Sequence, residues 1–224
     1  MKKLSEIKDW KELINEVVQG DCLGGMKMIP DKSIDLIVTD PPYGLNIASK
    51  GHVGGGSIRG TAQKFEMSLW DIKRPDKKYF EEIFRISKNQ IIFGGNYFID
   101  FLEPKSCWII WDKRDGLPER TFADCEIAWT SFEEPARIFR NKWDGFITEG
   151  KEQKLGHPTQ KPIALMQAII ERFSKETDLI CDPFMGSWTT ARACKDLGRN
   201  FIGFELEEKY CKVGEERLRQ QNLF

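Results

Sequence analysis

An apolar run that is stopped by two prolines constrains this chain more than any other feature. Residues 34–39 read Ile-Asp-Leu-Ile-Val-Thr, which is typical of a buried β-strand. Asp40-Pro41-Pro42-Tyr43 follows at once, and the prolines end the strand because neither can donate a ladder hydrogen bond. We expect this segment at the carboxyl edge of a sheet, where open α/β folds bind their ligands. A carboxylate, free backbone carbonyls and an aromatic face there suit a planar base that carries an amino group.

Strand and helix patterns alternate along the rest of the chain. The ranges expected as strands are 34–39, 90–93, 107–111, 126–130, 178–181 and 201–204, with a further short strand ending at 20–21. The ranges expected as helices are 5–18, a single turn at 26–29, 76–87, 161–173, 189–197 and 207–220. Residues 45–62 are expected to form a loop and residues 131–156 to be irregular. This alternation predicts an α/β fold whose mostly parallel sheet has helices on both faces.

Composition limits the class of protein. The 224 residues are 40% hydrophobic, which is enough to predict one domain over 1–224. No apolar run resembles a secretory signal or a membrane span. Six cysteines lie at irregular spacings without a Cys-x-x-Cys pair, and only two histidines are present. We therefore expect reduced thiols in a cytoplasmic protein, and no metal site.

Positive charge is concentrated just after the proline edge, although the formal net charge of the chain is -1. Residues 45–79 hold seven basic and three acidic side chains, a local charge of +4. A polyanion that approached the Asp40 edge would meet this region first. The basic residues taken as candidate nucleic-acid contacts there are Lys50, Arg59 and Lys64.

A second constellation lies near the C-terminus. Residues 178–190 read Asp-Leu-Ile-Cys-Asp-Pro-Phe-Met-Gly-Ser-Trp-Thr-Thr, a strand, a turn of small residues and a helix start. Backbone N–H groups at such a turn are free to face the polar end of a ligand. The next strand ends in Phe204-Glu205, where an acidic side chain can accept both hydroxyls of a ribose. An ordinary tight turn followed by a solvent-facing glutamate explains this pattern equally well on its own.

Together the two constellations resemble the permuted β group of amino-methylating DNA methyltransferases. That group has the Asp-Pro-Pro-Tyr motif first and the glycine turn last, as here, and the resemblance covers nearly the whole chain. It implies a Rossmann-like methyltransferase fold, S-adenosylmethionine as the cofactor, double-stranded DNA as the substrate, and a cytoplasmic, nucleoid-associated protein that a bacterium or a phage encodes. Two further segments match the family, Gly20-Asp21-Cys22-Leu23 and His157-Pro158-Thr159-Gln160-Lys161-Pro162.

The resemblance also implies residue roles. The target base leaves the duplex, because its amino nitrogen is otherwise paired and stacked. Tyr43 would stack on the flipped base, and Asp40 with the Pro41 carbonyl would accept the two amino hydrogens beside Pro42. The expected cofactor contacts are Asp21 at the adenine, Phe184 near the adenosine, Glu205 at the ribose, and Gly186 and Ser187, with Thr159 and Lys161 nearby, at the methionine end.

Two departures from the family pattern matter. Trp188 stands where the family has glycine, so either the cofactor pocket is blocked or the indole points away and packs on the sheet. The candidate target-recognition region, about 112–156, is short and mixes basic residues, among them Lys113 and Arg114, with acidic ones. A short region predicts a short site, loose specificity, or a homodimer that completes the interface.

Three functions are compared on these grounds. Aspartate rather than serine before Pro-Pro-Tyr favours adenine N6-methylation, with cytosine N4-methylation as the alternative. A catalytically silent DNA-binding homologue is a second class, supported by Trp188. An RNA-modifying enzyme is disfavoured, because its motifs usually come in the opposite order.

Overall fold

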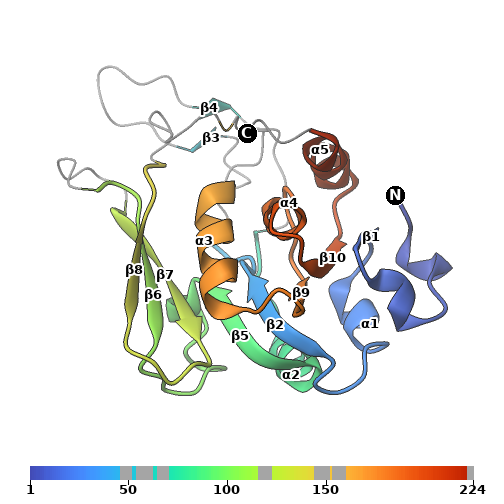
Figure 1. Cartoon of the computed structure of the whole chain (residues 1–224), viewed down its shortest axis with the longest axis horizontal. Coiled ribbons are helices and arrows are strands. Elements are labelled where there is room, and N and C mark those ends of the chain that lie inside the picture. The colour runs from blue at the N-terminus through green and yellow to red at the C-terminus, as the bar shows by residue number, and fades with distance from the viewer. Residues whose placement is uncertain are drawn as a thin grey trace.

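A twisted sheet forms the centre of the computed structural model (Figure 1), which describes residues 1–45, 52–53, 63–64, 71–115, 123–143, 152 and 160–220. Within these residues the sheet has eight strands in the order β1-β10-β9-β2-β5-β7-β6-β8. All neighbours from β1 to β5 are parallel, β7 is antiparallel to both β5 and β6, and β8 is parallel to β6. In sheet order the strands are Glu16–Gln19, Asn200–Glu205, Leu179–Asp182, Ile34–Thr39, Ser87–Phe93, Cys125–Thr130, Trp108–Asp112 and Arg137–Arg140.

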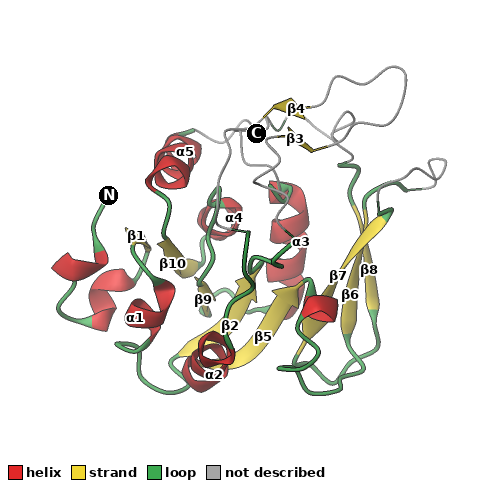
Figure 2. Ribbon diagram, turned by 180° about the vertical axis from the view of Figure 1, so that it is seen from behind, coloured by secondary structure: helices red, strands yellow, loops and turns green. Residues whose placement is uncertain are grey.

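Helices cover both faces of the parallel half, as predicted (Figures 1 and 2). The helices α3 (Ile163–Phe173), α4 (Thr189–Asp196) and α5 (Glu208–Arg219) lie on one face. The helices α1 (Cys22–Met26) and α2 (Lys77–Ile86) lie on the other. Each face buries its own apolar cluster, because alternate side chains of a strand point to opposite sides of the sheet. The chain is therefore an α/β protein with a three-layer core.

Prolines and a glycine explain where β2 ends, where α3 begins and where α4 ends. β2 ends at Thr39, directly before the residues Asp40 and Pro41. Helix α3 begins after Pro162, whose missing N–H costs nothing at a helix start. Helix α4 is followed by Gly198 at φ +66°, a left-handed conformation that glycine adopts without strain. These stops agree with the sequence prediction to within one or two residues.

Two predicted segments are wrong. Residues 5–18 do not form one helix but two 3-10 turns, Leu4–Glu6 and Trp10–Leu13, followed by β1. Asn15 turns the chain at φ 63°, and the β-branched Val17 and Val18 are buried in a strand paired with β10. Residues 131–156, predicted to be irregular, contain β8, whose cross-strand partner β6 is distant in sequence. The predicted turn at 26–29 is displaced to α1.

The strand order brings the two sequence constellations together. β2 and β9 are neighbours, with Leu36 opposite Ile180 and Ile37 opposite Cys181. Because both strands are parallel, Asp40 and the turn after Asp182 emerge at the same carboxyl edge, beside the end of β10. Thr39 Oγ1 donates a hydrogen bond of 2.7 Å to Asp182 Oδ1 and ties the two strand ends together.

Other predictions meet the described residues only in part. The loop predicted at 45–62 lies almost wholly outside them, and only β3 (His52–Val53), which pairs with β4 (Gln63–Lys64), is seen. Within the described ranges, no helix has the length and apolar character needed to cross a membrane. The candidate recognition region contributes β7 and β8 to the central sheet.

Candidate active site

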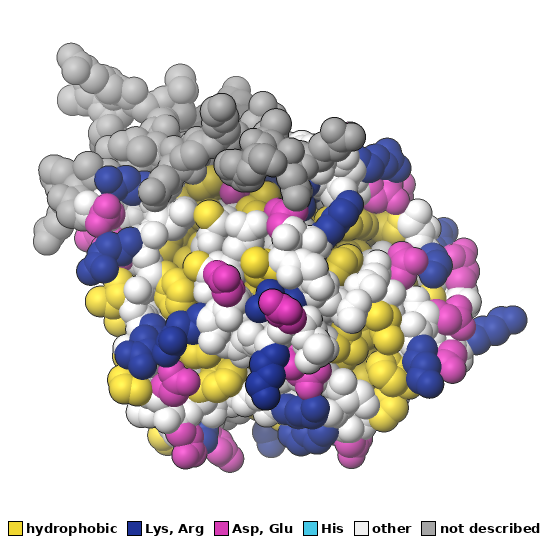
Figure 3. Space-filling view, in the orientation of Figure 1, with side chains coloured by type: hydrophobic (Ala, Val, Ile, Leu, Met, Phe, Trp, Pro, Cys, Tyr) yellow, Lys and Arg dark blue, Asp and Glu magenta, His cyan; other side chains and the backbone are white. Residues whose placement is uncertain are grey.

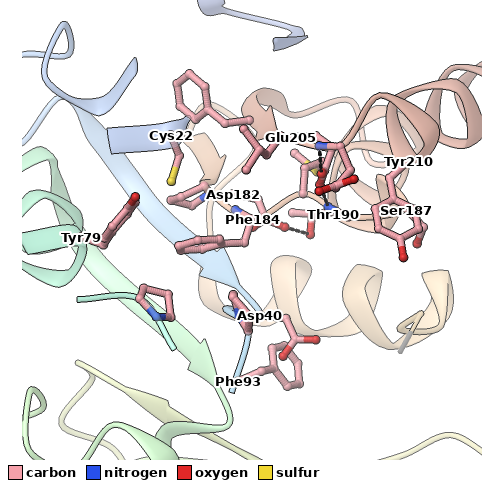
Figure 4. Close-up of a pocket in the computed structure, with 18 of the residues that line it drawn as sticks. Cys22, Asp40, Tyr79, Phe93, Asp182, Phe184, Ser187, Thr190, Glu205 and Tyr210 are labelled. Carbon is pink, nitrogen blue, oxygen red and sulfur yellow. Dashed lines mark hydrogen bonds between the residues drawn. The ribbon is translucent and has the colours of Figure 1, made fainter. Parts of the chain in front are cut away.

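A cavity of about 500 Å³ opens at the carboxyl edge of the parallel strands. Figure 4 shows Asp40 and Phe93 at one end, and Glu205, Ser187 and Tyr210 well apart from them. The Tyr79 and Phe184 rings lie on a third side. The lining comes from the turn after β1, the Asp40 edge, residues 73–76, the β9–α4 turn and the end of β10. The cavity therefore joins the N-terminal and C-terminal motifs in one space.

Asp40 is the acidic group at the first end of the cavity. Its Oδ1 accepts a hydrogen bond from the Tyr43 hydroxyl, and its Oδ2 accepts one from Lys161 Nζ. Burial raises the pKa of Asp40 above its usual range, and the neighbouring Lys161 ammonium opposes that rise. A carboxylate offers about four lone-pair positions, so two remain for a ligand's N–H groups. Pro42 also lines the cavity at this point.

Tyr43 lies beside the cavity rather than in its wall, and Pro41 is likewise outside the lining. The Tyr43 ring stacks on Tyr97 of the 3-10 turn Gly95–Tyr97, with centroids 4.8 Å apart and planes 20° from parallel. A Cβ atom on Gly94, which has φ +64°, would lie 2.1 Å from Tyr43 Cε1. Burial raises the pKa of Tyr43 well above its ordinary value. One face of the ring is thus covered by Tyr97, a contact that sequence reasoning missed.

Lys161 is 7% exposed and reaches the same end of the cavity. Its Nζ pairs with Asp40 and lies 3.1 Å from Glu126 Oε2, while Lys113 Nζ lies 3.2 Å from Glu126 Oε1. The ammonium also lies 5.0 Å from the centre of the Phe93 ring. Burial alone would lower the pKa of Lys161, but the two carboxylates raise it above its usual value. The sequence prediction put Lys161 near the methionine end of the cofactor; it lines the same cavity and contacts Asp40 and Glu126, a partner that the sequence did not indicate.

Glu205 forms the acidic group at the other end. The backbone N–H groups of Gly186 and Glu207 each donate a 2.7 Å hydrogen bond to it, one to each carboxylate oxygen. Gly186 has φ +54°, which explains the glycine at this turn. Glu205 is 8% exposed, and burial raises its pKa to about 7. Asp182 supports the turn by accepting hydrogen bonds from Thr39, Thr190 and the Phe184 N–H.

An aromatic wall and Asp21 complete the cavity. The rings of Tyr79 and Phe184 lie 6.0 Å apart between centroids, at 42° to each other. The Tyr79 hydroxyl is 3.4 Å from Asp21 Oδ2, and Asp21 Oδ1 accepts a 3.0 Å hydrogen bond from the Leu23 N–H. Asp21 therefore caps α1 and also faces the cavity. Tyr79 was missed, because nothing in its helical spacing distinguishes it from a packing residue.

Trp188 points away from the cavity. It is not a lining residue; its side chain is 4% exposed and belongs to the core between the sheet and the helices α3–α5. A Cβ atom on Gly214 of α5 would lie 2.0 Å from the indole, so that glycine makes room for it. Trp188 adopts φ 62°, a left-handed conformation that glycine adopts with less strain than tryptophan. The blocked-pocket interpretation is therefore wrong for this structure, and the alternative, an indole packed away from the site, is confirmed.

The candidate DNA contacts differ in their surroundings, and some of them fall outside the described residues. Arg114 is 5% exposed and its Nε lies 3.1 Å from Asp124, while Lys113 pairs with Glu126. Lys64 lies in β4, and Lys50, Arg59 and Thr159 fall outside the described residues. On the face seen in Figure 3, basic and acidic side chains are interspersed. Across the described positions, no cluster of three His, Cys, Asp or Glu side chains could hold a metal ion.

The family model of DNA methylases, which covers N6- and N4-methyltransferases, matches residues 80–216. The chain therefore belongs to this family of S-adenosylmethionine-dependent DNA amino-methyltransferases, as the two motifs predicted. Among curated relatives, the type II methyltransferase M.HinfI of Haemophilus influenzae is 30% identical and is matched over 93% of this chain and 69% of its own length. M2.DpnII of Streptococcus pneumoniae is 28% identical and is matched over 92% of this chain and 90% of its own length.

Solved structures agree with the family. The M1.HpyAVI–SAM complex superposes with a TM-score of 0.57 at 25% identity, over 92% of this chain and 99% of that one. The cytosine-N4-specific PvuII DNA methyltransferase superposes with a TM-score of 0.61 at 18% identity, over 93% of this chain and 88% of that one. At this identity the likeness shows the shared fold alone. The Rossmann-like methyltransferase fold and the cofactor expected from the sequence are confirmed.

The residues of the cavity fit S-adenosylmethionine. The aromatic wall of Tyr79 and Phe184 suits a flat adenine, and Glu205 retains lone pairs for ribose hydroxyls after accepting its two backbone N–H groups. A volume of about 500 Å³ lies within the usual range for a small-molecule site. Asp40 faces the same space, so a methyl donor and an amino acceptor can meet there.

Proposed function

We propose that this chain is a DNA adenine N6-methyltransferase that acts on a flipped-out adenine. The observation that carries the proposal is the single cavity that joins the Asp40 edge to the Glu205 turn. Aspartate before Pro-Pro-Tyr favours adenine over cytosine as the target. S-adenosylmethionine supplies an electrophilic methyl group, so the protein has to align and desolvate the amino nitrogen rather than provide a strong base.

Asp40 and the Pro41 carbonyl accept the two amino hydrogens of the base in this proposal. Accepting both hydrogens returns lone-pair density to the nitrogen and directs it toward the methyl group. Pro42 keeps the edge free of a competing N–H donor. Tyr43 stacks on the base with the part of its ring that Tyr97 leaves uncovered.

The proposed cofactor site uses the remaining lining residues. Glu205 accepts hydrogen bonds from the ribose, Phe184 packs on the adenosine, and Asp21 contacts the adenine. Gly186 and Ser187 border the methionine end, where Thr159 is also expected. The aromatic ring of Tyr79 is added to this set because it packs beside Phe184 in the same wall of the cavity.

Double-stranded DNA is the proposed partner, held through Lys50, Arg59 and Lys64. Lys113 and Arg114 join this set only if they exchange their ion pairs with Glu126 and Asp124 for phosphates. A homodimer would widen the interface that the short recognition region offers. In this proposal the enzyme is cytoplasmic and associated with the nucleoid.

The test is methyl transfer from labelled cofactor to unmethylated duplex DNA, followed by digestion to nucleosides. We expect labelled N6-methyl-2′-deoxyadenosine from the wild type, and none from Asp40→Ala, although that variant still binds the cofactor. Only N4-methylcytosine would overturn the adenine assignment. Cofactor and DNA binding without transfer would instead support a silent homologue, and labelling of structured RNA alone would identify an RNA enzyme.

A further inference from the structure

Four charged side chains are connected by ion pairs beside the Asp40 edge of the sheet. Lys161 bridges Asp40 and Glu126, and Lys113 contacts the second oxygen of Glu126. The four come from the end of β2, the segment before α3, β7 and the residue after β6. Two carboxylates and two ammonium groups balance, so the cluster carries no net charge. Of these four, only Asp40 and Lys161 line the cavity.

The contacts of Lys161 separate it from the cofactor end. Lys161 is 7% exposed, and its ammonium contacts Asp40, Glu126 and the Phe93 ring. The Glu205 turn is held by its own backbone N–H groups. Without the Lys161 ammonium, Asp40 would lose its cation while Glu126 would keep Lys113, so breaking the Lys161–Asp40 pair would leave a partly buried carboxylate without its ion pair.

We propose that Lys161, anchored by Glu126, is a positioning residue that holds Asp40 as a charged acceptor aimed at the amino group, rather than a ligand of the cofactor. The inference rests on the proposed function in one respect, that Asp40 receives the amino hydrogens. It goes beyond that function by assigning Lys161 and Glu126 a role in the transfer step.

Like-charge repulsion supplies the physical reason. Without the Lys161 ammonium, Lys113 would still balance Glu126, but Asp40 would lose the cation that it contacts, so burial and the nearby Glu126 charge would favour the protonated form of Asp40. A protonated Asp40 oxygen is a donor, which opposes the donor N–H groups of the base. Other ionisable groups near Asp40 are the Tyr43 hydroxyl and the Asp182 carboxylate, and neither can replace a cation.

The experiment compares Lys161→Met, Lys161→Arg, Glu126→Gln and the double variant Lys161→Met/Glu126→Gln with the wild type. We measure the affinity for S-adenosylmethionine by calorimetry and kcat for DNA methylation between pH 6 and 9. For Lys161→Met we expect kcat at pH 7 to fall about 100-fold and to recover as the pH rises, with cofactor affinity within about threefold of wild type. Lys161→Arg keeps the charge and should retain more activity at pH 7.

The double variant tests the anchoring role directly. Removing the second carboxylate relieves the repulsion, so Lys161→Met/Glu126→Gln should be more active at pH 7 than Lys161→Met. A purely structural role predicts that the second change lowers activity further. Lys88→Met is the matched control, because Lys88 pairs with Asp35 of the same strand β2 at its far end. We expect the Lys88→Met pH profile to follow that of the wild type.

A readout that is independent of methylation separates the two proposals. Carboxyl ¹³C titration of Asp40, assigned with Asp40→Asn, should show a higher pKa in Lys161→Met than in the wild type. An unchanged titration, or a large loss of cofactor affinity with kcat intact, overturns the positioning role. Absence of methylation by the wild type overturns the proposed function instead, and leaves the titration to decide the role of Lys161.

Discussion

Buried acidic groups at the two ends of the cavity are held in different ways. Among the described residues, Asp40 accepts hydrogen bonds from a lysine and a tyrosine hydroxyl, whereas the Glu205 carboxylate accepts them from backbone N–H groups. Burial, together with the nearby Glu207 and Asp182 carboxylates, outweighs the two backbone hydrogen bonds and raises the pKa of Glu205 to about 7, within the range where the enzyme would work.

Cofactor affinity should consequently depend on pH. Ribose hydroxyls donate to the ionised Glu205, so binding favours the deprotonated form, and protonation below about pH 7 competes with it. We expect the Kd for S-adenosylmethionine to rise by up to about tenfold for each pH unit below that point. Calorimetry at pH 5.5, 6.5 and 8 checks this.

The control for this prediction is Glu205→Gln, which cannot titrate and retains Asp182, whose pKa burial raises to about 6. Its affinity should be weaker at pH 8 and nearly independent of pH. Parallel curves for the wild type and Glu205→Gln would show that another group controls the pH dependence.

At the scale of elements, the β9–α4 turn shows how a tryptophan is accommodated at a left-handed position. The backbone of Trp188 is left-handed, and its indole packs against Gly214 on α5. The glycine that the turn lacks is thus matched by a glycine on the neighbouring helix. Space for the cofactor is unaffected, because the indole lies in the core on the side of the helices.

This contact predicts that Gly214→Ala destabilises the wild type but stabilises the Trp188→Gly variant. Trp188→Gly removes a buried ring, at a cost of about 3–5 kcal/mol, and relieves about 1–2 kcal/mol of left-handed strain. Gly214→Ala should destabilise the wild type, because its Cβ would lie 2.0 Å from the indole. In the Trp188→Gly background the same alanine should stabilise α5 by roughly 0.5–1 kcal/mol.

Urea unfolding of the four proteins measures this coupling. Additive effects of the two substitutions would show that Trp188 and Gly214 do not pack together in solution. Cofactor affinity of Trp188→Gly should stay within a few-fold of wild type. A large gain in affinity would show instead that the tryptophan obstructs the site.

For the whole molecule, the sheet order joins distant parts of the chain. β1 and β2 from the N-terminal part flank β10 and β9 from the C-terminal part. The cavity is lined by residues from both, Asp21 and Asp40 on one side and Phe184 and Glu205 on the other. A ligand of this cavity therefore binds the folded protein and not the unfolded chain.

Because the cofactor binds the folded protein, its binding should raise the Tm of thermal unfolding. Cofactor at 100 times its Kd should add about 2.7 kcal/mol to the free energy of unfolding. For a chain of this length we expect Tm to rise by about 5–10 °C. Glu205→Ala should lose most of the rise at the same concentration, whereas Asp40→Ala should keep it. Equal loss in both variants would place the cofactor differently.

Much of the fold and of the site follows from local sequence. The apolar run that ends at Asp40-Pro41 defines β2 correctly, because chain stops and side-chain periodicity act between near neighbours. The same reasoning failed for residues 5–18, whose helical spacing was overridden when Val17 and Val18 paired with β10. A pairing between strands so far apart in sequence leaves no local signal.

The sequence by itself determined the family, the mostly parallel sheet and the two motifs that meet at its edge. Only the tertiary structure decided that Trp188 packs against Gly214, that Tyr97 covers Tyr43, and that Lys161 binds Asp40 across 121 positions of sequence. The reason is physical. A motif is set by chemistry within a few residues, whereas the partner of a buried side chain depends on which strands and helices become neighbours in space.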